Sequence, residues 1–321
     1  MLRRVGLAAF VLVAGACITF SIHAWARRQD DLAARKAFDD LVHRVFVDAR
    51  ARLELPKYGL GGARGVAGSL GHLPDPPSFA RYVAARDMAT EFPGVIGFGL
   101  IVPVERGDRA RFEAQVRREG LPEFSVRTAG NAPVMHVIRS IEPEARNRAA
   151  LGFDVDSEPV RRAAAERVFS SGLPSATGPI RLLQDPAGRA GALILSPVFG
   201  SGRATRQGAG DPVIGSVYAA VVYDDLMAGS TPVPRQWIDV TIRDLDAPAA
   251  EQVVFRNHAP GRNDAARFAA AQRFDYFGRH FVLEGASTRA FDVLHNAGDR
   301  AVIILVGLLA SLLAAGLVYQ Q

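Results

Sequence analysis

The segment ATGPIRLL, residues 176–183, places a Thr-Gly-Pro turn directly before an apolar stretch that contains one arginine. Glycine and proline mark turns, and the alternation of side chains along a strand puts Ile180 and Leu182 on one face and Arg181 and Leu183 on the other. The segment therefore predicts a turn and a strand with one polar face. Three roles suit Arg181 at such a position: it closes the turn, pairs with a buried group or meets a ligand.

Apolar stretches on both sides of this segment predict an α+β layer with an antiparallel sheet. Four further strands are expected at residues 95–104, 134–141, 191–198 and 213–222. Amphipathic spacing predicts helices at residues 78–92, 106–119 and 158–171, with Ser78 as the cap of the first. The irregular order of these helices and strands is typical of α+β folds.

A second and shorter set of elements follows this layer. Strands are predicted at residues 237–242, 251–255 and 279–283, and a helix is predicted at residues 288–296. The chain therefore contains two α/β modules in series.

Both ends of the chain predict membrane-spanning helices. Residues 5–26 and residues 301–321 contain no charged side chain, and each run is long enough to cross the hydrocarbon core of a bilayer as a helix. A cleaved signal peptide is an alternative for the first run, because Ala24-Trp25-Ala26 has the small-x-small pattern, but the run is longer than the apolar core of such signals. A lipoprotein signal ending at Cys17 is disfavoured because the apolar run continues beyond that cysteine.

The membrane helices leave residues 27–300 on one side of the membrane. Arg3 and Arg4 favour a cytoplasmic N-terminus, although Arg27 and Arg28 at the other end of the first span weaken this bias. We therefore expect residues 27–300 to be periplasmic or extracellular and the protein to lie in the inner (cell) membrane.

A long amphipathic helix is predicted to leave the membrane. Residues 29–53 have apolar side chains at helical spacing, and Pro56 is expected to end the helix. Residues 58–77, which contain GLGGARGVAGSLGHLPDPP, are predicted to form a loop because they are rich in glycine and proline. The helix can pack on the domain that follows or pair with its counterpart in a second subunit.

The composition excludes several classes of function. The net charge is +5, but acidic residues are interleaved with the arginines, so no nucleic-acid partner is expected. The single cysteine lies in the first membrane helix, and no two of the seven histidines have the spacing of a helical zinc site. Asp154, Asp156 and Glu158 lack the pattern of a calcium loop and are interpreted as caps of the helix after them. We expect no metal, no cofactor and no catalytic residue.

Five segments in order resemble the CHASE domain, the extracytoplasmic sensor of histidine kinases, cyclases and cyclic-di-GMP enzymes. The resemblance spans about residues 80–226 and rests on the following segments: FPGVIGFGLIVPV, RARFEAQVRREGLPEFSV, IEPEARNRAALGFDVDSEPVRRAAAERVFSSG, ATGPIRLL and ALILSPVFG. It implies two PAS-like modules on a long stalk helix, a small ligand in the membrane-distal module, and a homodimer. The resulting boundaries are a cytoplasmic N-terminus 1–4, transmembrane helix 5–26, stalk 27–56, distal module 57–225, proximal module 226–300 and transmembrane helix 301–321.

The resemblance also points to ligand-binding positions in the distal module. By analogy with the plant cytokinin receptors, these positions are Ser140, Arg161, Thr177, Arg181, Leu183 and Leu195. Arg161 replaces the acidic side chain that pairs with the adenine ring in those receptors, and a cation that only donates hydrogen bonds cannot do the same. We therefore predict no binding of cytokinin.

The two arginines favour an anionic ligand such as a carboxylate. The alternative is that Arg161 is a solvated helix residue, like its neighbour Arg162, and that Arg181 braces the fold through Glu142 or Asp154. We favour the alternative, in which neither arginine touches the ligand.

These observations predict a transmembrane sensor that passes a signal to a cytoplasmic kinase or cyclase output domain, and the chain is then expected to be a fragment of a longer protein. An anchored extracytoplasmic enzyme is the first alternative. The second is a structural protein of the cell envelope, with Gly307, Ser311, Ala310 and Ala314 packing the second membrane helix.

Overall fold

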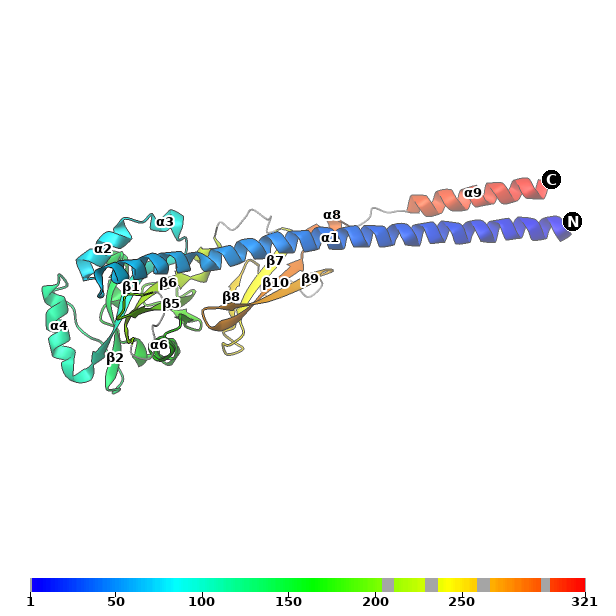
Figure 1. Cartoon of the computed structure of the whole chain (residues 1–321). Coiled ribbons are helices and arrows are strands. Elements are labelled where there is room, and N and C mark those ends of the chain that lie inside the picture. Colours follow the sequence, from blue (N-terminus) through cyan, green and yellow to red (C-terminus); the bar gives the residue numbers. More distant parts are fainter. Residues whose placement is uncertain (1, 204–210, 229–235, 259–265, 296–300, 321) are drawn as a thin grey trace.

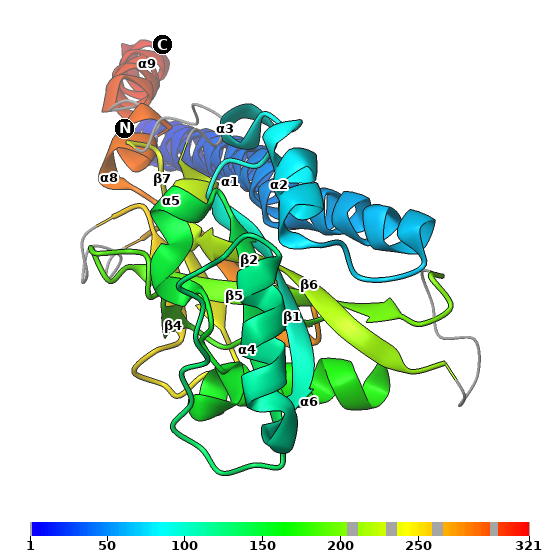
Figure 2. The same ribbon diagram turned by 90° about the vertical axis from the view of Figure 1, so that its left-hand side faces the viewer.

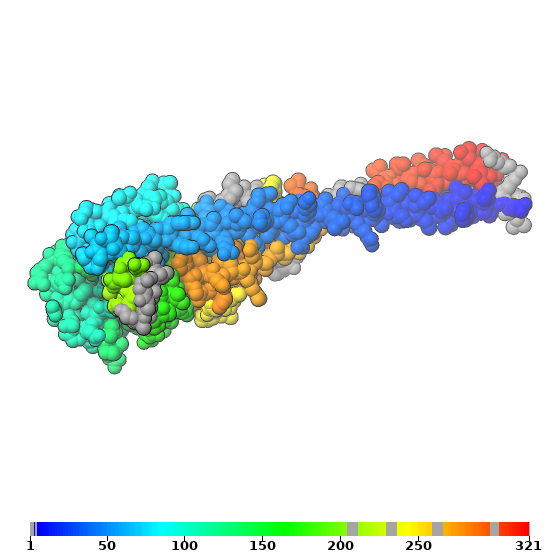
Figure 3. Space-filling view, viewed as in Figure 1, coloured from blue at the N-terminus to red at the C-terminus, as the bar shows by residue number. Residues whose placement is uncertain are grey.

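The computed structural model describes residues 2–203, 211–228, 236–258, 266–295 and 301–320. One helix, α1 (Leu2–Leu70), runs along the whole molecule and carries a larger α/β module at its C-terminal end and a smaller sheet nearer its middle (Figure 1). A second apolar helix, α9 (Ala301–Gln320), lies beside the N-terminal part of α1, and this pair extends away from the rest of the protein (Figure 3). The fold is therefore α+β on a long N-terminal helix.

Helix α1 is longer than the sequence predicts, and the prediction that Pro56 ends it and that a loop follows is wrong. Pro56 lies inside the helix, which continues through the glycine-rich segment to Leu70. A Cβ atom on Gly59 would lie 2.1 Å from Cζ of Phe98, and one on Gly62 would lie 2.4 Å from the hydroxyl of Tyr82. The glycines therefore let the helix approach neighbouring elements closely, and this packing outweighs their low helix propensity.

The apolar stripe that the sequence predicts on α1 is buried. Phe38, Leu41, Phe46 and Leu53 belong to one hydrophobic core with residues of both sheets. Helix α1 is thus the common support of the two modules.

The first sheet is antiparallel, with strand order β2-β1-β6-β5-β3 and β4 paired to β5. Its strands are β1 (Val95–Glu105), β2 (Val134–Glu142), β3 (Ser175–Ala176), β4 (Ile180–Arg181), β5 (Ala190–Phe199) and β6 (Val213–Val222). The single strand predicted over residues 176–183 is in fact two short strands, because the Thr-Gly-Pro turn interrupts the pairing with β5.

Short helices surround this sheet. They are α2 (Pro76–Ala84), α3 (Met88–Glu91), η1 (Arg106–Asp108), α4 (Arg109–Arg118), α5 (Glu144–Asn147), η2 (Arg148–Ala150), η3 (Val155–Ser157), α6 (Pro159–Ser171) and α7 (Tyr223–Met227). Figure 2 shows α1 and α2 on one side of the sheet and α6 on the other. Asp75, not Ser78, caps α2, since its carboxylate accepts a hydrogen bond from the Ser78 amide.

The expected capping role of the acidic residues before α6 is confirmed for Glu158, whereas Asp154 caps the short helix η3 and Asp156 pairs with His136 instead. Glu158 accepts hydrogen bonds from the amides of Val160 and Arg161, and the Asp154 side chain accepts one from the Asp156 amide at the start of η3. Carboxylates at these positions satisfy helix N–H groups that have no partner within the helix.

The second sheet is also antiparallel, in the order β8-β7-β10-β9. Its elements are β7 (Ile238–Asp244), β8 (Val253–Arg256), β9 (Ala269–Tyr276), β10 (Arg279–Ser287) and the helix α8 (Arg289–Leu294), which Thr288 caps. Strand β9 was not expected, because its sequence AAAQRFDY begins with three alanines and is largely exposed. Asn296, the predicted end of α8, lies outside the described residues, as does Gln321 at the end of the predicted second span.

The two modules meet at the turn between β9 and β10. The amide of Ala176 in β3 donates to the carbonyl of Phe277 over 2.9 Å, and Nη1 of Arg167 in α6 donates to the carbonyl of Gly278 over 3.1 Å. Beside the turn, Arg279 and Asp244 form an ion pair of 2.6 Å in which the Asp244 side chain is fully buried. The hairpin therefore joins the second sheet directly to elements of the first module.

Helices α1 and α9 are both long and apolar enough to cross a membrane, and they pack against each other through small residues. A Cβ atom on Gly15 would lie 2.2 Å from Oγ of Ser311, and one on Gly307 would lie 2.3 Å from Oγ1 of Thr19. The small residues predicted to pack the second membrane helix thus include two, Gly307 and Ser311, that face α1 of the same chain. Ala310 and Ala314 are exposed.

Candidate ligand-binding site

The face of the first sheet that α6 covers holds a small cavity. Its volume is about 10 Å³, the space of a single water molecule. The lining residues are Ile138, Ala150, Phe153, Arg161, Leu182, Leu183, Gln184, Leu193 and Tyr218. Three of them, Arg161, Gln184 and Tyr218, are polar, and the other six are apolar.

Arg161 is a buried residue, which contradicts its interpretation as a solvated helix position. Only 8% of it is exposed, whereas its neighbour Arg162 is on the outer side of α6. Its guanidinium donates to the Glu158 carboxylate over 3.3 Å and to the carbonyl of Arg181 over 2.8 Å, and it lies 5.6 Å from the centre of the Phe153 ring. Burial lowers the pKa of Arg161, and the adjacent Glu158 opposes this shift.

Tyr218 in β6 is fully buried, and its hydroxyl has no hydrogen-bond partner among the described residues. Burial raises the pKa of this phenol, and the nearby Arg161 opposes the shift only in part. The ring fits because residue 99 on the adjacent strand is glycine, where a Cβ atom would lie 2.4 Å from Cε1 of Tyr218.

Three more of the predicted residues lie on or beside this face. Leu183 lines the cavity with its side chain partly exposed, and Leu195 is paired with Tyr218 across β5 and β6. Thr177 is buried, and its hydroxyl accepts a hydrogen bond of 3.0 Å from the Leu193 amide. Thr177 therefore fixes the turn to β5.

Ser140 is separated from this face. It pairs with Leu100, which belongs to the core beside α1, whereas the adjacent Ile141 belongs to the core beneath α6. The buried hydroxyl of Ser140 has no partner among the described residues. The structure thus does not place Ser140 in the cavity with Arg161.

Arg181 does not brace the fold through Glu142 or Asp154, as the sequence had suggested. Asp154 accepts hydrogen bonds from the Thr128 hydroxyl and the His136 amide, and Glu142 accepts one from the Glu144 amide. The Arg181 side chain is exposed in an open pocket of about 550 Å³ at the boundary of the two modules. That pocket is lined by both arginines together with Glu158, Glu251 and Val253, among others.

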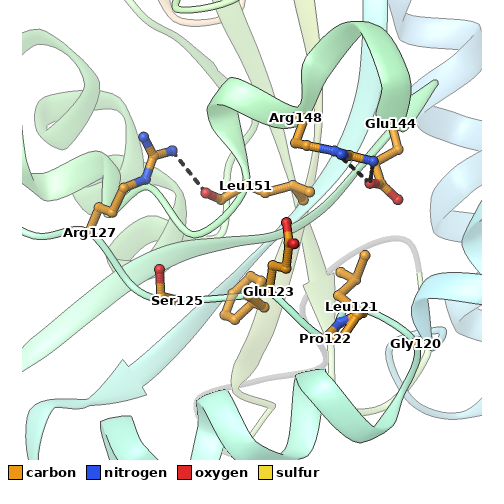
Figure 4. Close-up of a pocket in the computed structure, with 10 residues that line it drawn as sticks. Gly120, Leu121, Pro122, Glu123, Ser125, Arg127, Glu144, Arg148 and Leu151 are labelled. Carbon is orange, nitrogen blue, oxygen red and sulfur yellow. Dashed lines mark hydrogen bonds and ion pairs between the residues drawn. The ribbon is translucent and has the colours of Figure 1, made fainter.

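A second pocket, of about 540 Å³, lies between residues 120–127 and residues 144–151 (Figure 4). Arg127 and the ion pair of Arg148 with Glu144 stand at its sides, and Glu123 projects into it. No pattern in the sequence predicted this groove, because its walls come from loops and short helices that carry no periodic signal. Within the described residues, no group of three or more His, Cys, Asp or Glu side chains is placed to hold a metal ion.

Comparison with known families agrees with the resemblance seen in the sequence. The family model of the CHASE domain matches residues 74–255, which include the whole first sheet, β7 and most of β8. A comparison with curated proteins gives no match. Because the family model covers more than half of the chain, the protein belongs to the CHASE domain family.

Proposed function

We propose that this protein is an extracytoplasmic sensor that binds a small ligand and passes the signal through the membrane. The observation that carries the proposal is a CHASE domain whose supporting helix continues without a break into an apolar helix, with a second apolar helix packed beside it. In this proposal α1 and α9 span the inner (cell) membrane, and residues 27–300 are periplasmic. The receiver of the signal is a cytoplasmic histidine kinase or cyclic-di-GMP output domain.

The proposed ligand site is the cavity beside Arg161, Leu183, Leu195 and Tyr218 in a PAS-like distal module, residues 57–225. The buried guanidinium of Arg161 favours a ligand with an anionic group, because a desolvated cation interacts strongly with a carboxylate. The present volume has no room for such a ligand, so binding requires the cavity to open. We still expect no binding of a cytokinin, since Arg161 offers only hydrogen-bond donors to the adenine ring of such a ligand.

The proposed route of the signal passes through the turn between β9 and β10. Opening the cavity displaces α6 and β3, which hold that turn through Arg167 and the Ala176 amide. Strand β10 leads directly into α8 and then towards α9, so a shift of the turn is transmitted to the membrane through the proximal PAS-like module, residues 226–300.

The proposed assembly is a homodimer formed along α1. Leu32, Val47 and Tyr58 of this helix are more than half exposed. Burying apolar side chains of this size between two copies would stabilise such a dimer. Because α1 packs on α9 within each chain, the dimer would bring the two membrane helices of each subunit together as a bundle of four helices.

A chimera tests the proposed cavity without knowledge of the ligand. Residues 1–321 are joined to the catalytic core of a histidine kinase, and autophosphorylation is measured in membranes for Ala150→Leu and Ala145→Leu. Ala150 is buried and lines the cavity, whereas Ala145 is exposed on α5. Added volume in a packed core displaces its neighbours, so Ala150→Leu is expected to change the kinase output and Ala145→Leu to leave it unchanged. An unaltered output from both variants, with normal amounts of protein in the membrane, would contradict the proposal.

A further inference from the structure

We propose that the groove between residues 120–127 and residues 144–151 is a second binding site, for an α-amino acid with an apolar side chain. This inference goes beyond the proposed function, because the groove is separate from the cavity beside Arg161. Its volume of about 540 Å³ lies within the range of small-molecule sites.

The groove has an apolar floor that is open to solvent. Leu121, Pro122 and Leu151 line it, and none of the three side chains is fully buried. Phe124 also contributes to the lining, but it is anchored in the core with Val116 and Met135. The apolar part of a ligand therefore has a surface to cover.

An uncompensated carboxylate projects into this groove. Glu123 is exposed and makes no hydrogen bond or ion pair with any residue that the structure describes. Figure 4 shows its carboxylate between Leu121 and Pro122 on one side and Leu151 and Arg148 on the other. The Ser125 side chain belongs to the same segment, residues 120–127. These groups suit the ammonium group of a ligand.

Two guanidinium groups flank the same space and suit a carboxylate. Arg148 pairs with Glu144 over 3.0 Å, but its side chain is 71% exposed, so a ligand can compete for it. The Nη2 atom of Arg127 donates to the carbonyls of Ala149 and Leu151, which fixes the guanidinium at the edge of the groove. The remaining nitrogens of the two arginines are available to the ligand.

The charges of the groove select a zwitterion. A ligand with a carboxylate alone leaves Glu123 without a counter-charge and brings a second anion near it. A ligand with an ammonium group alone leaves the arginines unmatched in the same way. An α-amino acid satisfies both signs and places its side chain on Leu121, Pro122 and Leu151.

The two walls are held in a fixed relation before any ligand binds. The Arg127 amide donates to the carbonyl of Gly152 over 2.7 Å, and the Asp154 amide donates to the carbonyl of Arg127 over 2.9 Å. Gly152 has φ +73°, and a Cβ atom there would lie 1.9 Å from the carbonyl oxygen of Ser125, so only glycine fits. A site built on walls that are already aligned loses less free energy on binding.

The test is calorimetric titration of the full chain in nanodiscs with three probes. These are L-leucine, 4-methylpentanoate, which lacks the ammonium group, and isoamylamine, which lacks the carboxylate. We expect L-leucine to bind at least about ten-fold more tightly than either analogue, since each analogue leaves one charge of the groove unpaired. Glu123→Gln and Arg148→Gln should each weaken L-leucine binding by about ten-fold or more, through the loss of one charged contact.

The control variant is Arg146→Gln, at an exposed arginine of α5 that does not line the groove. It should bind L-leucine as the unmodified chain does. Glu123, Arg146 and Arg148 are exposed, whereas Arg161 is buried, and circular dichroism verifies that each variant folds. Absence of L-leucine binding at millimolar concentrations would overturn the inference. Binding that survives Glu123→Gln and Arg148→Gln but is lost in Arg161→Leu would also overturn it, because the ligand would then occupy the cavity of the proposed sensor function.

Discussion

Replacing Tyr218 with phenylalanine is predicted to stabilise the protein. The Tyr218 hydroxyl is fully buried and has no partner among the described residues, although the cavity beside it is large enough for one water molecule. A buried hydroxyl without a hydrogen-bond partner lowers the free energy of unfolding of the protein. Sites that bind ligands commonly carry this kind of cost.

The size of the effect follows from the hydroxyl alone. A buried polar group without a hydrogen bond costs about 1–3 kcal/mol, and phenylalanine keeps the rest of the ring in place. The lost oxygen enlarges a cavity that is already present, which offsets part of the gain. We therefore expect a net stabilisation of about 1 kcal/mol, or a rise in Tm of about 1–2 °C for a protein of this size.

Thermal unfolding of the full chain in detergent, followed by circular dichroism, measures this change. Tyr223→Phe is the matched control, because the Tyr223 hydroxyl is also buried without a described partner but lies in the core beside Phe281. Both variants should be more stable than the unmodified protein. A loss of about 1 kcal/mol or more in Tyr218→Phe alone would refute the reasoning, since the hydroxyl would then be satisfied in the unliganded protein.

Three further predictions concern packing, the module boundary and pH. Gly59→Ala should destabilise the protein by about 1–3 kcal/mol because the added Cβ meets Phe98, whereas Gly61→Ala, whose Cβ would have no atom within 4 Å, should stabilise α1 by about 0.5–1 kcal/mol. Urea unfolding measures both changes, and equal effects would contradict the close approach of α1 to Phe98. Arg279→Met leaves the buried Asp244 carboxylate without its partner and should cost about 3–5 kcal/mol. Arg243→Met, at the more exposed pair with Glu284, should cost less than about 1 kcal/mol; a small effect of Arg279→Met in the same assay would contradict the burial of its ion pair. Burial raises the pKa of Glu142, so its charged form opposes folding as the pH rises through the folded pKa. Glu142→Gln should therefore be more stable than the unmodified chain at neutral pH, and the difference in the free energy of unfolding should shrink below about pH 4, the ordinary range of a glutamate. A difference that grows as the pH falls would contradict a raised pKa of Glu142.

The elements with strong apolar patterns were predicted from the sequence, and those that depend on tertiary contacts were not. Strands β1, β2, β5 and β6 have bounds within two residues of the prediction, because β1, β5 and β6 are mostly apolar runs and β2 mixes apolar with polar residues between clear turn signals. The C-terminal part of α1 was mistaken for a loop, since glycine is a poor helix former and only the contacts with Phe98 and Tyr82 explain the helix there.

The candidate site was predicted in part. The sequence placed Arg161, Leu183 and Leu195 near one another but assigned Arg161 to solvent. The spacing of Arg161, Ala164, Ala165 and Val168 on α6 is that of one buried helix face, and this signal would have placed Arg161 against the sheet. Tyr218 and the groove around Glu123 depend on which strands and loops become neighbours, and that information is absent from local patterns.

Cysteine labelling in intact cells tests the central claim most directly. In a Cys17→Ser background, Ala187→Cys presents a thiol at an exposed position of the first module. A membrane-impermeant maleimide should label Ala187→Cys in intact cells, and it should label Gln320→Cys only after the membrane is opened. Labelling of Ala187→Cys that requires lysis would place the CHASE domain in the cytoplasm and contradict an extracytoplasmic sensor.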